Sequence, residues 1–172
     1  MNCEIQTEYT PVALSAMARA LRKTQRKGRS LVAHILGTCL ILMCVFLAIT
    51  PHLVDESQSI GYGTLAISLI LLLIMLFEDR LNGYLAYKRM LPGSKTAVTV
   101  FGEESYDTRT DGAVGKWEYS RITEICRTKR YYIFVMGKNH GQAFDREGFL
   151  QGTEAELEAL LQEKTGLQIK DI

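Results

Sequence analysis

"LVAHILGTCLILMCVFLAI", from Leu31 to Ile49, decides the fold class of this 172-residue chain. It contains no charged side chain, and neither does a second run, "IGYGTLAISLILLLIMLF", from Ile60 to Phe77. At a rise of about 1.5 Å per residue, each helix approaches the roughly 30 Å hydrocarbon thickness of a bilayer. Both runs are apolar on every face, unlike a surface helix of a globular protein. We therefore predict two transmembrane helices.

Two other interpretations of these runs are weaker. A cleaved signal sequence has an apolar core of about 7–15 residues behind a short basic segment, whereas the run from Leu31 is longer and some thirty residues precede it. A buried soluble hairpin would need more polypeptide than the rest of the chain to wrap both helices. A retained helical hairpin is the better interpretation.

Basic residues predict the orientation of the hairpin. The connecting loop, Thr50–Ser59, has no Lys or Arg and carries Asp55 and Glu56. Lys and Arg are retained on the cytoplasmic side during insertion. We predict a multi-pass protein of the cytoplasmic membrane with both termini cytoplasmic, Pro51 helping to turn the external loop, and Ser57 accessible from outside. The basic flanks are Arg19, Arg22, Lys23, Arg26, Lys27, Arg29, Arg80, Lys88, Arg89 and Lys95.

The segment 1–30 precedes the membrane helices and has its own pattern. Its first residues alternate and predict a short strand, and Thr10-Pro11 is a typical helix start, with a hydroxyl N-cap and proline at the first helical position. The following helix has a weakly apolar stripe and becomes basic toward Arg29. It either lies on anionic lipid or packs on the cytoplasmic domain. We favour packing, because alanine is a weak membrane anchor.

The remaining residues form the hairpin unit 31–94, which includes a cytoplasmic extension of the second helix, and a cytoplasmic domain, 95–172. In the latter, alternating patterns predict short antiparallel strands, with a hairpin at Asp111-Gly112. A terminal helix over Glu154–Lys164 begins with a capping box. We therefore expect an α+β membrane protein whose curved antiparallel sheet or open barrel is closed by a C-terminal helix.

One mixed stretch, "KWEYSRITEICRTKRYYIFVM" from Lys116 to Met136, resembles a nucleic-acid-binding face. Its aromatic residues are spread over several predicted strands, where aromatics are common. Its basic residues fall in a turn between strands, and the aromatic-glycine signature of an RNA-recognition motif is absent. With a net charge of +1, the sequence predicts no nucleic-acid partner. Trp117 is expected in the core, near Leu157 and Leu161.

Sequence motifs for catalysis are not found. There is no nucleophile elbow, phosphate-binding glycine loop or zinc-protease motif. We identify no catalytic, cofactor-binding or metal-binding residue, and predict that the protein is not an enzyme. His34 is interpreted as a hydrogen-bonded packing residue rather than a proton site. The four cysteines are expected to be free thiols; they are Cys3, Cys39, Cys44 and Cys126.

Two apolar helices followed by "WEYSRITEICRTKRYYIFV" and "QAFDREGFLQGTEAELEALLQEKTG" resemble the YcxB-like proteins of bacteria. The resemblance implies a pleckstrin-homology-like (PH-like) cytoplasmic domain on a helical hairpin, and no known reaction. Here Asp145-Arg146 replaces the proline and lysine usual in the family's last turn. The matching positions are Trp117, Ile122, Ile125, Tyr131, Tyr132, Arg146, Phe149, Gly152 and Leu161.

Three classes of function remain. The first is a membrane-anchored, non-catalytic module that recruits or regulates a protein partner through the sheet edge or the groove beside the C-terminal helix. The second is an auxiliary subunit of a transporter or membrane enzyme, contacting its partner through the membrane helices. The third, lipid sensing, ranks last, because the turn where PH domains hold phosphoinositides is the acidic "GEES", 102–105, here. An integral position in the lipid bilayer is expected, and homo-oligomers remain open.

Overall fold

A computed structural model describes residues 3–55, 59–137 and 139–172. The loop positions Glu56 and Ser57 lie outside the described residues. The chain divides into two compact units. One, here called the folded domain, combines Met1–Arg26 with Asp79–Ile172. The other, the helical hairpin, is Lys27–Glu78.

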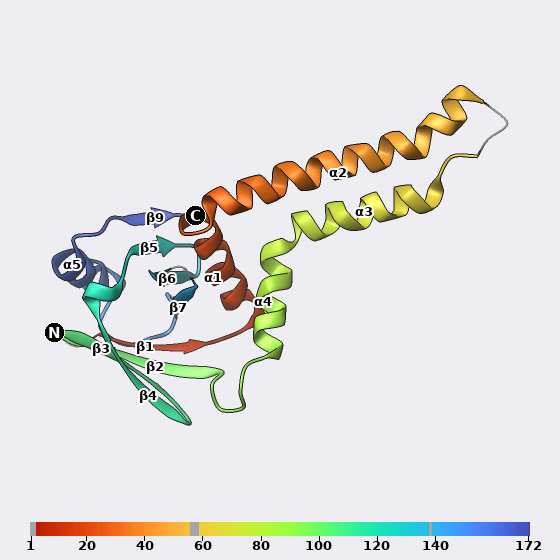
Figure 1. Ribbon diagram of the computed structural model, residues 1–172. Coiled ribbons are helices and arrows are strands. Elements are labelled where there is room, and N and C mark those ends of the chain that lie inside the picture. The colour runs from red at the N-terminus through yellow and green to blue at the C-terminus, as the bar shows by residue number, and fades with distance from the viewer. Residues whose placement is uncertain (1–2, 56–58, 138) are drawn as a thin grey trace. The chain divides into compact units, whose positions relative to one another are not determined.

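The helical hairpin consists of α2, Lys27–Val54, and α3, Tyr62–Leu76 (Figure 1). Among the described residues, α2 is the helix that is long and apolar enough to cross a membrane, whereas α3 is also apolar but has only 15 residues. The most apolar window of α2 is only 6% buried, unlike the core helix of a soluble protein. Pro51 lies inside α2 rather than in the turn, which corrects its predicted role. Its missing N–H costs one hydrogen bond close to the helix end.

His34 makes local contacts at the start of α2. Its Nδ1 lies 2.7 Å from the carbonyl oxygen of Ser30, one helical turn earlier. Its Nε2 lies 3.7 Å from a carboxylate oxygen of Glu78. These contacts fit a hydrogen-bonded packing residue, as expected from the sequence.

In the part of the chain that the structure describes, the folded domain contains two sheets, of which A is antiparallel and B is mixed. Sheet A has the order β4-β3-β2-β1-β8, and sheet B has the order β7-β6-β5-β9, in which β9 pairs with β5 in parallel. The strands of sheet A are β1 Cys3–Glu8, β2 Thr96–Phe101, β3 Ser105–Thr110, β4 Ala113–Glu118 and β8 Phe149–Gln151. Those of sheet B are β5 Glu124–Arg127, β6 Tyr131–Met136, β7 His140–Asp145 and β9 Ile169–Asp171. The helices are α1 Pro11–Thr24, α4 Glu78–Lys88, η1 Tyr119–Arg121 and α5 Glu154–Thr165.

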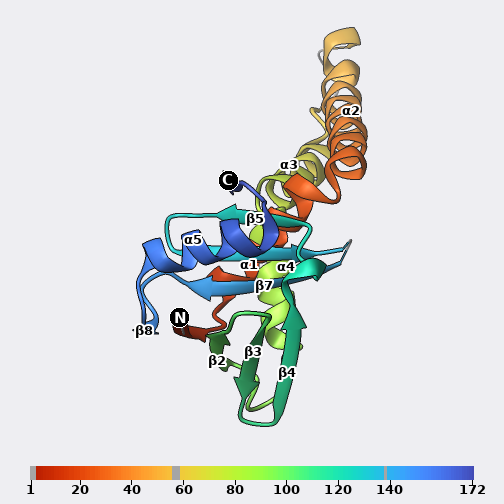
Figure 2. The same cartoon turned by 90° about the vertical axis from the view of Figure 1, so that its left-hand side faces the viewer.

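Sheet B is buried on both faces, which explains the near-continuous apolar sequence of β6. Alternate β6 residues point to opposite sides of the sheet. Tyr132 and Phe134 belong to a core with sheet A and α5, whereas Ile133 and Val135 belong to a second core with α1. Figure 1 shows α1 beside the strands of sheet B, and Figure 2 shows α5 lying across them. The aromatic centre of the first core is Phe101, Tyr106, Phe134 and Phe144.

The N-terminal caps that the sequence predicts for α1 and α5 are confirmed. Thr10 caps α1 by accepting a hydrogen bond from the backbone N–H of Ala13. Thr153 and Glu156 form the capping box of α5. Gly166 ends α5 with φ of 65°, a left-handed conformation that suits glycine. The antiparallel pairing of β3 with β4 confirms the hairpin at Asp111-Gly112.

The N-terminal segment is part of the folded domain, whereas the sequence predicted separate segments 1–30 and 95–172. β1 lies between β2 and β8 in sheet A, and α1 covers the second core. The division differs because the alternating residues of β1 complete a sheet whose other strands lie beyond the hairpin in sequence. The packing interpretation of the α1 stripe is confirmed, since Ala13 and Ala20 are fully buried.

Trp117 is half-buried at the edge of the first core, not inside it as predicted. It lies on β4, an edge strand that leaves most of its residues exposed. Its ring stacks on that of His140, with centroids 5.1 Å apart. The fully enclosed aromatic beside it is Tyr106. An edge strand has one free side, so its large side chains are covered only in part.

Candidate functional site

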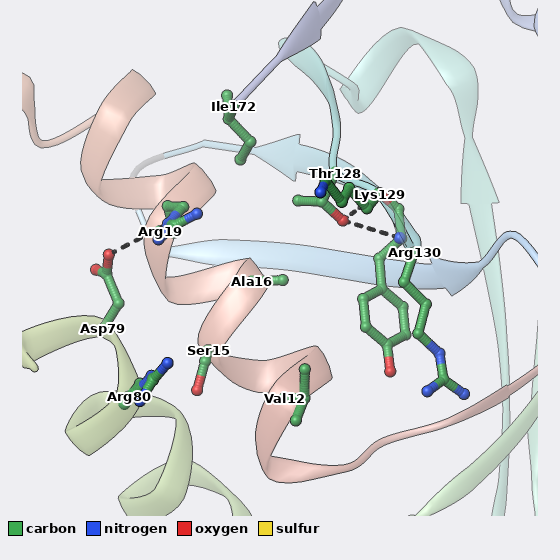
Figure 3. Close-up of a pocket in the computed structure, with 11 residues that line it drawn as sticks. Val12, Ser15, Ala16, Arg19, Asp79, Arg80, Thr128, Lys129, Arg130 and Ile172 are labelled. Carbon is green, nitrogen blue, oxygen red and sulfur yellow. Dashed lines mark hydrogen bonds and ion pairs between the residues drawn. The ribbon is translucent and has the colours of Figure 1, made fainter.

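A pocket of about 400 Å³ lies between α1, α4 and the turn that joins β5 to β6 (Figure 3). All its walls belong to the folded domain. Its volume is within the range of about 300–1,000 Å³ that is usual for small-molecule sites. We call it the α1–α4 pocket. It is lined by Val12, Ser15, Ala16, Arg19, Asp79, Arg80, Thr128, Lys129, Arg130, Tyr131 and Ile172.

One wall of the pocket is fixed by a clamp between α1 and α4. The guanidinium of Arg22 donates to both carboxylate oxygens of Asp79, at 2.8 and 2.6 Å. One turn further along α4, Gly83 is buried against α1, and a Cβ added there would lie 2.4 Å from the backbone nitrogen of Ser15. Bidentate arginine–carboxylate pairs are both strong and geometrically specific. The two segments that enter and leave the helical hairpin are thus held together inside the folded domain.

The opposite wall is the β5–β6 turn, whose backbone is tightly bonded. The hydroxyl of Thr128 accepts from the backbone N–H of Tyr131 at 2.9 Å. The guanidinium of Arg146 donates to the carbonyl oxygens of Thr128 and Lys129, at 3.0 and 3.1 Å. The tip of the turn, Lys129 and Arg130, is therefore presented on a fixed backbone.

Basic side chains outnumber acidic ones in the described lining of the pocket. Asp79, the single acidic side chain, is 15% exposed and already engaged by Arg22. Arg19 makes only a longer contact of 3.7 Å to Asp79 and leaves 51% of its side chain exposed. Lys129 forms no ion pair within the described residues, and Arg130 pairs with Asp145 at 3.1 Å. The side chains of the described lining therefore carry a net positive formal charge.

Tyr131 contributes a buried polar group to this site. The residue is 2% exposed, and its hydroxyl has no hydrogen-bond partner in the part of the chain that the structure describes. A buried hydroxyl without a partner costs about 1–3 kcal/mol, so native structures rarely leave one unpaired. The guanidinium of Arg130 lies 5.6 Å from the centre of the same ring. The pocket thus combines an unpaired hydroxyl with surrounding cations.

Apart from Ser15, the rest of the pocket lining is apolar. Val12 and Ala16 lie along α1, facing the pocket, as Figure 3 shows. Val12 keeps 64% of its surface exposed, which is high for a side chain so near the core. Ile172 adds a further aliphatic side chain. The site therefore has a charged rim and an apolar wall.

Both surfaces expected to contact a protein partner are present in the folded domain. A groove of about 530 Å³ runs beside α5 and is lined by Ala159 and Leu160 together with Glu103 and Glu163. The β3–β4 hairpin projects from the rest of the domain in Figures 1 and 2, and β4 ends sheet A. Val114 on β4 is 70% exposed. An uncovered edge strand offers backbone groups to a further strand.

The basic residues of the stretch 116–136 do not form one open cationic face. Arg127 pairs with Glu158 and Asp171, at 2.9 and 2.8 Å, and Arg130 pairs with Asp145. Like charges in a turn between strands are expected to be solvated, but both arginines form ion pairs instead. The acidic partners come from β7, α5 and β9, which fold back onto the β5–β6 turn.

A polar network attaches α5 to sheet B. Tyr132 donates through its hydroxyl to carboxylates of Glu154 and Glu158, and Arg146 pairs with Glu154 at 2.6 Å. The hydrogen bond from Tyr132, aided by Arg146, lowers the pKa of Glu154 below its ordinary value. Burial, together with these hydrogen bonds, raises the pKa of the Tyr132 hydroxyl, so that group stays protonated and remains a donor. This network is structural.

Metal-ligand clusters of three or more His, Cys, Asp or Glu residues are absent from the described ranges. The four cysteines are free. Cys126 is buried in the second core, where burial raises the pKa of its thiol to about 11.

Sequence reasoning missed the clamp and the pocket. The available signals were an isolated glycine at position 83, inside a predicted helix, and an acidic residue at position 79, directly after an apolar run. A glycine within a helix often marks close packing. Neither signal names its partner, because Ser15 and Arg22 lie more than fifty residues away in sequence.

The central part of the folded domain is similar to a known protein family. Residues 101–163 match the family of YcxB-like proteins. This match confirms the resemblance inferred from the sequence, over the strands from the end of β2 to α5. No curated protein matches the chain.

Proposed function

We propose that the protein is a non-catalytic interaction or regulatory module, anchored in the cytoplasmic membrane of a bacterial cell. In this proposal α2 and α3 both cross the bilayer, both termini are cytoplasmic, and the folded domain is a PH-like module displayed in the cytoplasm. The two charge-free runs, Leu31–Ile49 and Ile60–Phe77, support the anchoring, and the basic flanks with the acidic loop support the orientation. The antiparallel strands closed by α5, within a YcxB-like segment, support a PH-like domain.

The clamp between α1 and α4 carries the functional part of the proposal. These helices are the segments directly before α2 and directly after α3 in the chain. Because Arg22 and Asp79 bind each other inside the folded domain, the domain holds both roots of the hairpin. A partner that binds the domain then acts on a unit that is joined to the anchor by the chain at two points, as a recruiting or regulatory module requires.

An auxiliary subunit of a transporter or membrane enzyme is the second candidate. Large apolar side chains on α2, such as Leu36 and Phe46, are 64% and 65% exposed. Such side chains contact either lipid or the helices of a partner. This function would place the partner contact on the hairpin rather than on the folded domain.

Topology is tested by labelling intact cells with an impermeant maleimide. Ser59→Cys should be labelled from outside, and a reporter fused after Ile172 should be cytoplasmic. Cysteine at Ser105, in the folded domain, should be labelled only after the membrane is opened. External labelling of the Ser105 cysteine would exclude the proposed orientation.

Photo-crosslinking in native membranes separates the two candidate functions. A crosslinking residue at Val114 samples the edge of the folded domain, and one at Phe46 samples the hairpin. The interaction module predicts a protein adduct from Val114, whereas the auxiliary subunit predicts one from Phe46 alone. The same residue placed at buried Phe134 should give no adduct and serves as the control.

A further inference from the structure

We propose that the α1–α4 pocket binds the phosphate-bearing headgroup of an anionic phospholipid. This inference rests on the proposed membrane anchoring. It concerns a different place from the acidic turn at 102–105, where the sequence argued against lipid sensing.

The charges of the pocket favour an anion. Arg22 takes both oxygens of Asp79, so the one acidic side chain in the lining is already neutralised. Arg19 and Lys129, from opposite walls, remain largely exposed. Phosphate oxygens accept several strong hydrogen bonds from such cations. The pocket is thus suited to a compact anion held between α1 and the β5–β6 turn.

The hydroxyl of Tyr131 is the second observation that points to a ligand. It is buried in the wall of the pocket and lacks a partner among the described residues. A phosphate oxygen would accept a hydrogen bond from this hydroxyl, for which the described part of the protein supplies no acceptor. The apolar ligand surface would then lie against exposed Val12 and half-buried Ala16 on α1.

Chain connectivity favours a lipid over a soluble phosphate. Arg80 follows the last residue of α3 by four positions, and Arg19 precedes the first residue of α2 by eight. Four residues span at most about 14 Å. If α2 and α3 cross the bilayer, the pocket residue Arg80 cannot be far from the headgroup layer. A pocket with a cationic rim and an apolar wall matches an amphiphile there.

The test uses the full chain in detergent micelles and counts retained lipids by native mass spectrometry. At equal loading, the wild type should retain phosphatidylglycerol in clear preference to phosphatidylcholine. The double variant Arg19→Gln/Lys129→Gln should lose this retention by about tenfold or more, because hydrogen bonds to charged groups are strong. Tyr131→Phe keeps the ring and should weaken retention by several fold.

The matched control removes two charges elsewhere. Lys27→Gln/Arg29→Gln alters the helical hairpin and leaves the pocket lining unchanged, so it should retain phosphatidylglycerol like the wild type. An equal loss in this control would mean that general charge attraction, not the pocket, holds the lipid, and the proposal would be wrong. Unchanged retention by Tyr131→Phe would also overturn it. Thermal melting of each variant checks that the fold is intact.

Soluble phosphates distinguish the source of the anion. Glycerol 3-phosphate and inorganic phosphate are added as competitors at millimolar concentration. The proposal expects weak displacement, because neither molecule covers the apolar wall. Full displacement of phosphatidylglycerol by these competitors, with equal retention of phosphatidylglycerol and phosphatidylcholine in their absence, would assign the pocket to a soluble phosphate. That result would overturn the lipid assignment. A protein that leaves the membrane in alkaline carbonate would instead refute the anchoring itself, so the two failures are distinguishable.

Discussion

Gly83 shows how one residue decides a helix contact in this protein. It lies in the interior of α4, where glycine is unfavourable by roughly 1 kcal/mol relative to alanine. Its position is explained by Ser15, whose backbone nitrogen and Cα would lie 2.4 and 2.7 Å from an added Cβ. Backbone atoms cannot rotate away, as the end of a side chain can. The lower helix propensity is therefore the cost of a close approach between α1 and α4.

Gly83→Ala should destabilise the folded domain by about 1–3 kcal/mol, the usual cost of overpacking. The change is read as a lower melting temperature of the full chain in detergent. Gly63→Ala is the matched control, since nothing lies within 4 Å of an added Cβ in that helix position. An unchanged melting temperature for Gly83→Ala would mean that the two helices separate without loss of stability.

Cys126 should be almost inert toward maleimides in the folded protein. Thiolate is the reactive form, and burial holds the thiol pKa at about 11. At pH 8 roughly one thiol in a thousand is ionised, from three units of difference. Labelling should require unfolding, whereas a cysteine placed at exposed Val114 should react within minutes. Rapid labelling of native Cys126, located by peptide mapping, would show that α1 opens readily from sheet B.

At the scale of elements, α5 depends on charge as well as on its apolar face. Leu157 and Leu161 are fully buried in the first core. Glu154, in the first turn of the helix, accepts hydrogen bonds from Tyr132 and Arg146. Carboxylates near a helix N-terminus are also favoured by the helix dipole. The attachment of α5 should therefore depend on the ionisation of this carboxylate.

Glu154→Gln should lower the melting temperature at pH 7 more than at pH 3. Folding lowers the pKa of Glu154 below 4.5, so folding favours the charged form. The stabilisation is present above the unfolded pKa and is lost as pH falls through the lowered folded pKa. Glu8→Gln, at an exposed position of β1, is the control for the removal of one carboxylate charge at each pH. A Glu154→Gln effect that is equal at both pH values would assign the loss to packing alone.

At the scale of the whole molecule, the folded domain is discontinuous in sequence. β1 and α1 precede the hairpin, whereas every other strand follows it. Without them sheet A loses the strand between β2 and β8, and the second core loses the helix that covers Ile133 and Val135. The expected domain 95–172 therefore lacks part of its own core.

Residues 95–172 expressed alone should be unfolded or aggregated. A chain that joins residues 1–26 to 79–172 through about six glycine and serine residues should fold, because the bonded pair Arg22–Asp79 shows that the two ends lie close together. Circular dichroism and a cooperative melting transition distinguish the two outcomes. A stable, cooperative 95–172 fragment would show that β1 and α1 are accessory.

The sequence by itself determined the features that depend on neighbouring residues. Three local patterns show this. The apolar run at Leu31–Ile49 indicated a long apolar helix, and the capping box at Thr153 indicated the start of the C-terminal helix. The alternation after Lys95 indicated most of the strands. Each of these signals lies within one turn or one strand, so no distant partner is needed to read it.

Only the tertiary structure decided which distant segments meet. It placed β1 in sheet A, paired β9 with β5, moved Trp117 to the edge of the core and joined Arg22 to Asp79. It also brought Arg19, Lys129 and the unpaired hydroxyl of Tyr131 into one pocket. Such contacts join residues that are 44 to more than one hundred positions apart. Their partners are selected by shape and by the burial of a shared core, which local periodicity does not record.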